Sequence, residues 1–317
     1  MVTEVLNKRD SFTYQNNTIM KKIFITIVLM LFLQSKTYSQ QETLVTQFNY
    51  QMSLFNPAGL ILDDESKLAI IHRRQTNNIP LSPITTSLTY GLNIGENAAI
   101  GISIIKDQFF IEDNSFVSID YSYKLKLDDK TDLYLGLKAG GNFYSINTLD
   151  LNTYNYSSDP SLSSFSEFMP NIGAGLIIKK NDFYFSFSIP RMLSTKKIKE
   201  SQNKVTTVKD EPHFYTALGY NFLLDESQNI KLKSNVLMRN VSGAPSTFDY
   251  NAMFSFNDNF DLGMVFRTGK NYAALAQFKI SKELLFGWSY EINRSANFPT
   301  ISESGTTLEF LLSYKFN

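Results

Sequence analysis

Apolar and polar residues alternate with a period of two along most of the chain from residue 66 onward. Leu133, Leu135 and Leu137 share one parity, for example, whereas Gly136 and Lys138 share the other. Because successive side chains of a strand point to opposite faces, one face of such a stretch suits lipid and the other suits water. About fourteen stretches of this kind follow one another, and several run to ten residues or more, longer than the strands of most soluble sandwiches. The pattern predicts an all-β fold, a closed antiparallel transmembrane β-barrel of about 14 strands.

The expected strands follow from the bounds of the alternating stretches. They span residues 66–74, 83–94, 97–105, 115–127, 131–145, 171–179, 182–189, 212–223, 229–240, 246–256, 259–267, 271–280, 283–291 and 305–316.

The connections between these stretches differ in length according to their order. Every even-numbered connection is a short polar turn, such as Lys180-Asn181 or Asn257-Asp258. The longest connections, 146–170, 190–211 and 292–304, are odd-numbered and rich in Ser, Asn and Thr. Outer-membrane barrels combine short periplasmic turns with long extracellular loops. We therefore expect an outer-membrane location with the long loops outside and both termini in the periplasm.

The region before the first strand has the parts of a secretory leader. Two basic residues, Lys21 and Lys22, precede an apolar run over residues 23–33, and small Thr37 and Ser39 follow at the positions that a signal peptidase reads. We expect a signal peptide that begins at Met20.

The chain is thereby expected to have four parts. These are an upstream or non-native extension over residues 1–19, the signal peptide over 20–39, an N-terminal segment over 40–65 and the barrel over 66–317. The segment 40–65 is expected either to stay in the periplasm or to fold into the lumen as a small plug.

Composition excludes several classes of protein. No apolar run reaches the roughly 20 residues that a membrane helix needs. The 317 residues carry no Cys, which excludes disulfides, thiolate metal sites and a Cys nucleophile. Removal of residues 1–39 leaves 25 basic and 28 acidic residues, so the mature chain is mildly acidic. Nucleic acid is not an expected partner.

The inward parity of the predicted strands carries charged side chains. These are Lys138, Lys231, Lys233, Arg239, Arg267, Lys279, Glu291, Glu309 and Lys315. One interpretation is a basic strip that lines the lumen. The other is that these residues are polar only because water or a plug contacts them.

No catalytic, cofactor-binding or metal site is expected. A serine hydrolase would need a base, and only His72 and His213 are available, His72 beside two arginines and His213 at the start of a strand. Asp63-Asp64-Glu65 lacks the ligand spacing of a calcium loop. Gly173-Ala174-Gly175 lacks the third glycine of a nucleotide fingerprint and predicts a site of close strand packing. An enzyme is therefore not expected.

Short motifs also occur in a recognisable order across the mature chain. They begin with Phe55-Asn56-Pro57-Ala58-Gly59, Arg73-Arg74-Gln75, Pro83-Ile84-Thr85, Tyr121-Ser122-Tyr123 and Leu135-Gly136-Leu137-Lys138-Ala139-Gly140. They continue with Gly173-Ala174-Gly175, Phe187-Ser188-Ile189-Pro190, Pro212-His213-Phe214-Tyr215 with Gly219-Tyr220, Gly243-Ala244-Pro245, Leu262-Gly263 with Phe266-Arg267, and Gly287-Trp288-Ser289-Tyr290-Glu291.

In this order the motifs resemble the PorP/SprF family, outer-membrane proteins associated with the type IX secretion system of the Bacteroidetes. The resemblance covers nearly the whole chain from Gln47 onward. It implies a non-enzymatic barrel that helps a secreted cargo, such as a large adhesin, to reach or stay on the cell surface, often in the setting of gliding motility. The implied partners are that cargo, periplasmic ring components of the machinery and outer-membrane lipid.

Two other functions stay open from the residues alone. The barrel could be an outer-membrane channel for small solutes or hydrophobic substrates, or a lipid hydrolase that depends on His72 or His213. A channel predicts conductance in planar bilayers, whereas a hydrolase predicts that one of the two histidines is essential.

Overall fold

The computed structural model describes residues 45–62, 65–76, 81–147, 165–201, 204–242, 244–269, 271–293 and 305–316. The predicted leader and upstream extension, residues 1–39, lie outside the described residues. The barrel belongs to a compact unit formed by residues 41–242 and 246–317. Of the other unit, only Ala244 and Pro245 are described.

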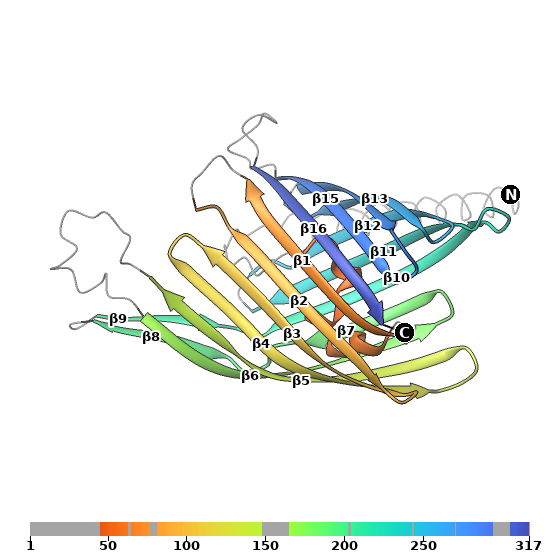
Figure 1. Ribbon diagram of the computed structural model, residues 1–317. Helices are drawn as coiled ribbons and strands as arrows, with labels where there is room; N and C mark the ends of the chain where they lie inside the picture. The colour runs from red at the N-terminus through yellow and green to blue at the C-terminus, as the bar shows by residue number, and fades with distance from the viewer. Residues whose placement is uncertain are drawn as a thin grey trace, which may run out of the picture. The chain divides into compact units, whose positions relative to one another are not determined.

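Fourteen antiparallel strands form a closed barrel, in which the first strand pairs with the last (Figure 1). The strands are β1 (Ser66–Thr76), β2 (Ile84–Ile94), β3 (Ala98–Phe109), β4 (Glu112–Lys126), β5 (Thr131–Ile146), β6 (Phe165–Lys180), β7 (Phe183–Ile189), β10 (His213–Asp225), β11 (Ile230–Val241), β12 (Thr247–Phe256), β13 (Phe260–Arg267), β14 (Asn271–Lys279), β15 (Leu284–Asn293) and β16 (Gly305–Phe316). Closure pairs Ser66 with Phe316 and Thr76 with Thr306, so the first and last strands leave no open sheet edge between them. The predicted fold class is confirmed.

Two features differ from the sequence prediction. The connection expected over 190–211 contains a separate two-stranded sheet, β8 (Thr195–Ser201) and β9 (Lys204–Asp210). In addition, β6 begins at Phe165, six residues before the expected start at 171, because its first residues continue to pair with β5. The sequence prediction placed both segments in long connections, 146–170 and 190–211, and so did not include this pairing.

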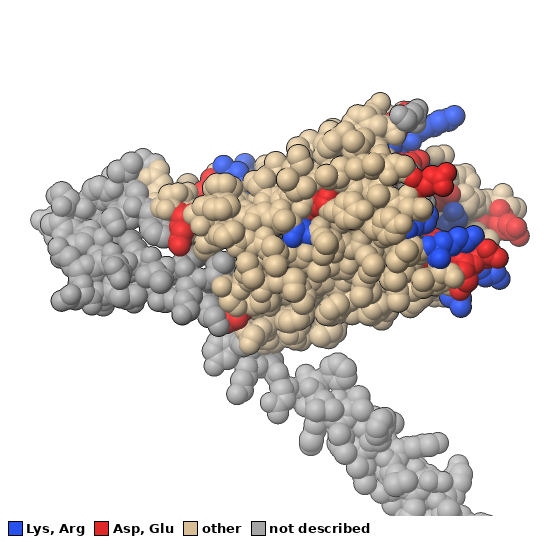
Figure 2. Space-filling model, turned by 90° about the horizontal axis from the view of Figure 1, so that it is seen from below, with Lys and Arg blue, Asp and Glu red and all other residues tan. Residues whose placement is uncertain are grey.

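The two faces of the wall have opposite character, as the alternation predicted. In β16, Phe310 and Leu312 face outward, whereas Glu309 is buried inside. Figure 2 shows an outer surface with few charged side chains along its middle, while charged residues gather at one end. Outward aromatic rings also pack against each other, as Phe260 does with Phe278 at 4.9 Å between centroids. Such a surface suits the hydrocarbon core of a membrane.

The two ends of the barrel are set apart by their connections. At the end that we call the short-turn end, tight turns join β2 to β3, β4 to β5 and β6 to β7, and Asn181 and Asn257 adopt positive φ values of 52° and 51°. Asparagine tolerates this left-handed conformation better than most residues. The opposite end, the long-loop end, carries the connections from β5 to β6, β7 to β10 and β15 to β16. Among the described residues, no helix is long and apolar enough to cross a membrane.

Candidate functional site in the barrel lumen

Residues 45–62, which we call the plug segment, lie inside the barrel. They form three short 3-10 turns, η1 (Phe48–Tyr50), η2 (Met52–Leu54) and η3 (Pro57–Ile61), seen as coils between the strands in Figure 1. Most of these side chains are buried against inward-facing residues of the wall. Short 3-10 turns leave part of their backbone without internal partners, and the lumen wall supplies several of these.

Asn56 is the centre of the plug segment's contact with β6 and β7. Its Nδ2 donates to the carbonyl of Leu176 at 3.0 Å and to the hydroxyl of Ser186 at 2.8 Å. Its Oδ1 accepts from the backbone N–H of Ala58 at 3.0 Å, which caps η3, where Pro57 occupies the first position. One amide side chain thereby starts the turn and attaches it to the wall.

Two glycines on neighbouring strands make room for this contact. Gly136 of β5 pairs with Gly175 of β6. A Cβ atom at Gly136 would overlap the backbone N of Ala58, and one at Gly175 would overlap Oδ1 of Asn56. Only glycine allows so close an approach. The three motifs that contain Asn56, Gly136 and Gly175 are far apart in sequence and therefore meet at one point.

The start of the plug segment is held by a carboxylate of the last strand. Glu309 of β16 accepts from the backbone N–H groups of Thr46 and Gln47, both at 2.8 Å. Arg73 of β1 donates to the hydroxyl of Thr46 at 2.9 Å and also contacts Glu309 at 3.3 Å. The Arg73 and Glu309 side chains are 4% and 0% exposed, so these charge-assisted hydrogen bonds are shielded from water.

Arg73 and Glu309 are one end of a row of alternating charges inside the wall. We call it the arginine–carboxylate chain, and its members in spatial order are Glu309, Arg73, Glu291, Arg267, Asp249 and Arg239. Each member contacts the next, with distances of 3.3, 2.9, 2.8, 2.9 and 3.0 Å along the row. Three guanidinium groups and three carboxylates balance, which offsets the cost of burying each charge.

A second buried ion pair lies on the other side of the lumen. Lys138 of β5 contacts Asp120 of β4 at 2.7 Å, and both side chains are almost fully buried. The hydroxyl of Ser103 also donates to Asp120. The lysine is therefore part of a local polar network rather than of a basic surface.

The remaining inward cations lie near the short-turn end. Lys233 contacts Asp261 at 2.9 Å, and Asp261 also accepts from the hydroxyl of Tyr50 in the plug segment. Lys231 contacts Asp258, Lys315 contacts Glu65, and Lys279 is exposed. The hypothesis of a basic strip is wrong, because acidic residues on nearby strands and turns neutralise most of the inward cations.

The structure places the two histidines in different settings. His72 points outward, where Nδ1 lies 2.9 Å from the hydroxyl of Thr86, and the alternation of β1 puts neighbouring Arg73 on the opposite face. His213 is the buried first residue of β10. Of the acidic run at 63–65, residues 63 and 64 lie outside the described residues. Within the described part of the chain, no cluster of His, Asp and Glu could hold a metal ion.

The sequence prediction included Glu291 and Glu309 among the inward residues but missed Arg73 and the inward aspartates. Asp120 and Asp249 stand on the inward parity of β4 and β12, a signal that could have found them. Leu311 carries a further signal, since an apolar residue on the inward parity of β16 needs an apolar partner inside. That partner is the plug segment, because Leu311 packs in one cluster with Val45.

These features define an outer-membrane type of β-barrel whose lumen holds the chain's own N-terminal segment. The chain belongs to the family described as type IX secretion system membrane protein PorP/SprF, whose model matches residues 37–314. The family predicted from the motifs is thereby confirmed.

Solved structures share the fold at low sequence identity. The Pseudomonas putida toluene transporter TodX is similar with a TM-score of 0.51 and 8% identity, over 88% of this chain and 99% of that one. The CymD monoaromatic hydrocarbon channel gives a TM-score of 0.50 and 11% identity, over 88% of this chain and 95% of that one. At this identity the likeness shows the fold alone. No curated protein matches the chain.

Proposed function

We propose that this protein is a non-enzymatic barrel that assists the secretion or surface attachment of a type IX cargo, such as a large adhesin. The family match identifies a membrane protein of the type IX secretion system, and the role toward a cargo is our proposal. The observation that carries the proposal is the plug segment, which is attached to β1, β6, β7 and β16 by buried hydrogen bonds. A lumen occupied in this way suits a docking platform better than an open channel.

The proposed orientation follows the asymmetry of the connections. The long-loop end faces the cell exterior and meets the cargo, whereas the short-turn end and both termini face the periplasm and meet ring components of the machinery. The residues expected as a signal peptide, 20–39, direct export, and gliding motility is a setting for the cargo. Charged residues gathered at the short-turn end support a surface that contacts water and periplasmic proteins (Figure 2).

Deletion of the gene tests the role. We expect surface adhesin to be lost or shed into the medium, and restored by the wild-type gene. The purified barrel should give little conductance in planar bilayers. Normal surface adhesin together with a large, steady conductance would contradict the proposal and favour a solute channel.

Protease treatment of whole cells tests the orientation. We expect cleavage within 146–170 or 190–211 while the outer membrane is intact. Cleavage of these segments only after the outer membrane is ruptured would reverse the proposed orientation.

A further inference from the structure

The outward face of the barrel wall is uneven in charge. On β7 and on β10 to β16, the described outward residues include no charged side chain. Near the long-loop end of β1, β3 and β4, by contrast, the outward residues include Arg74, Lys106 and Asp113. We call these three residues, together with His72, the outer polar patch. The patch lies on the face that meets lipid, where a charge costs free energy unless it is matched.

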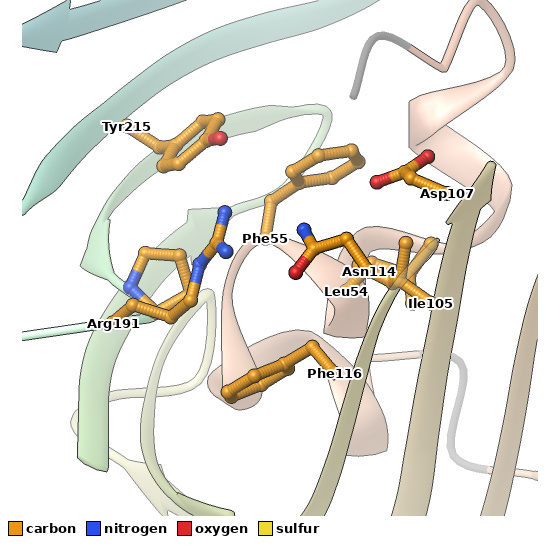
Figure 3. Close-up of a pocket in the computed structure, with 9 residues that line it drawn as sticks. Leu54, Phe55, Ile105, Asp107, Asn114, Phe116, Arg191 and Tyr215 are labelled. Carbon is orange, nitrogen blue, oxygen red and sulfur yellow. The ribbon is translucent and has the colours of Figure 1, made fainter. Parts of the chain in front are cut away.

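The outward direction of the patch follows from the neighbouring side chains. Ile105 and Asp107 of β3 line a pocket inside the barrel and point into it (Figure 3). Because side chains alternate along a strand, Lys106 points outward, and its side chain is 46% exposed. On β4, Asn114 lines the same pocket, so Asp113 before it also points outward.

Asp113 is already matched within the outer face of the wall. Its carboxylate lies 2.9 Å from Nζ of Lys106, and it accepts from Nε2 of Gln108 and from the hydroxyl of Ser115, both at 3.2 Å. These contacts neutralise one cation of the patch and fix its position. An ammonium group has three N–H donors, so Lys106 keeps donors for a further acceptor.

Arg74 is the cation that the patch leaves unmatched. Its side chain is exposed, and within the described part of the chain its guanidinium makes no hydrogen bond or ion pair. Two residues earlier on the same face, His72 contacts the hydroxyl of Thr86 through Nδ1 at 2.9 Å. The outer polar patch therefore carries one positive charge that no acidic residue balances, with N–H donors that face the membrane.

The register of the strands places Arg74 at the level expected for lipid headgroups. Arg74 pairs with Leu308 of β16, and Leu308 pairs with Tyr290 of β15. Tyr290 stacks with Trp288 on the outer face, with 6.4 Å between the ring centroids. Tyr and Trp rings on outer-membrane barrels gather where the membrane meets water. A guanidinium in this row is thus within reach of the phosphate groups of lipids.

We propose that the outer polar patch binds the phosphate of an anionic lipid in the leaflet at the long-loop end. The planar fork of the Arg74 guanidinium donates to two phosphate oxygens, and Nζ of Lys106 donates to the same group. Only β2 separates their strands, a spacing of about 10 Å that two long side chains and a phosphate can bridge together. The charge of the lipid balances the charge of Arg74.

The wall beside the patch suits the acyl chains of the same lipid. Ile70 of β1, Leu88 of β2 and Ile104 of β3 form the next outward row toward the short-turn end, and they are paired across the three strands. All three are apolar, so the acyl chains lie along them while the headgroup stays at the patch. This lipid site is independent of the proposed role toward a cargo.

The only tryptophan of the chain reports on the lipid beside the patch. Trp288 pairs with Phe310, which pairs with His72, so Trp288 lies two strand spacings, or about 10 Å, from the patch. The folded full chain is placed in phosphatidylcholine vesicles that contain a small fraction of brominated phosphatidylglycerol, whose bromine quenches tryptophan fluorescence at short range. Matched vesicles contain brominated phosphatidylcholine instead. We expect the anionic lipid to be enriched about fivefold beside Trp288.

Charge variants test which residues cause the enrichment. Arg74→Gln should abolish it, and Lys106→Gln should reduce it because Asp113 is then unmatched. Asp113→Asn should increase it. Lys126→Gln is the control, because it removes the same charge from an exposed pair at the short-turn end and should leave the enrichment unchanged. Equal quenching by the two lipids in the wild type, or unchanged enrichment in a folded Arg74→Gln barrel, would overturn the proposal.

Inorganic phosphate distinguishes a lipid from a soluble ligand. An excess of inorganic phosphate, compared with sodium chloride at the same ionic strength, should leave the enrichment intact, because the acyl chains hold the headgroup beside the patch. Loss of the enrichment in phosphate alone would identify a site for free phosphate and would overturn the lipid as the occupant.

Discussion

Individual side chains decide how the plug segment is held. Glu309 serves two backbone donors and one guanidinium, so a single carboxylate joins the plug segment to both β16 and β1. Its neighbour Arg73 also contacts Glu291, which extends the connection into the arginine–carboxylate chain. Buried charges of this kind cost free energy unless every one is paired. A substitution at one end therefore affects more than one contact.

Glu309→Gln should release the start of the plug segment. The amide keeps the shape but loses the charge, so the free energy of unfolding should fall by about 2 kcal/mol. Because the chain has no Cys, Ser53→Cys gives a single thiol in the plug segment whose labelling rate reports its exposure. Labelling should be faster in the Glu309→Gln background. Lys126→Gln, which breaks an exposed pair with Asp129, is the control and should change neither quantity measurably.

At the scale of elements, the plug segment fits a part of the wall that has no side chains. This part exists because Gly136 and Gly175 lie side by side on β5 and β6. It receives η3, whose first residues are fixed by Pro57 and by the cap from Asn56. The fit depends on the absence of side chains from the wall rather than on their identity.

Gly175→Val should displace η3 without preventing barrel formation. The new side chain overlaps Asn56, and overpacking of this kind costs about 1–3 kcal/mol. The thiol of Ser53→Cys should again become accessible. Ala174→Val is the matched control, because residue 174 has the outward parity of β6 and its substitution should leave labelling unchanged. Slow labelling in both variants would contradict the close contact at Gly175.

The turn between β4 and β5 should respond to acid. The backbone N–H of Lys130 donates to Asp128 at 2.8 Å and the hydroxyl of Thr131 adds a second bond, which lowers the pKa of Asp128 below its ordinary value of 3.8. A lowered pKa in the folded state stabilises the turn above the ordinary pKa, and this contribution is lost as pH falls through the folded value. Carboxyl NMR titration should give a pKa below 3.8. A result at or above the ordinary value would contradict the turn geometry.

At the scale of the whole molecule, the plug segment occupies part of the lumen of the barrel. The wall, the plug segment and the arginine–carboxylate chain share one interior. Apolar clusters on the plug segment and on β1, β10, β11 and β16 form part of it. Where the plug segment meets these strands, the packing resembles the core of a soluble protein.

Removal of residues 45–62 should open the lumen. The shortened barrel should conduct ions in planar bilayers, whereas the intact chain should show only small or rare openings. Glu309→Gln should lie between the two, because it loosens only one end of the plug segment. A shortened barrel that folds and does not conduct would contradict the role of this segment as the obstruction.

The wall of the barrel could be predicted from the sequence better than its contents. Alternation indicates the outward and inward parity of β16, including Glu309 and Phe310, because lipid and lumen impose opposite demands on neighbouring residues. The plug segment has no alternation of apolar and polar residues, since its 3-10 turns are buried on several sides against an irregular wall. Pairing partners such as Asp120 for Lys138 depend on strand register, which the parity of a single strand does not determine.

The contact between Glu309 and the start of the plug segment also orders the assembly of the molecule. Thr46 and Gln47 precede the first strand, and Glu309 is on the last one. The plug segment therefore acquires this anchor only when β16 joins β1 and the wall closes. Closing the barrel and fixing the start of the plug segment are therefore coupled, so a chain cut short before β16 would lose this anchor together with the closure.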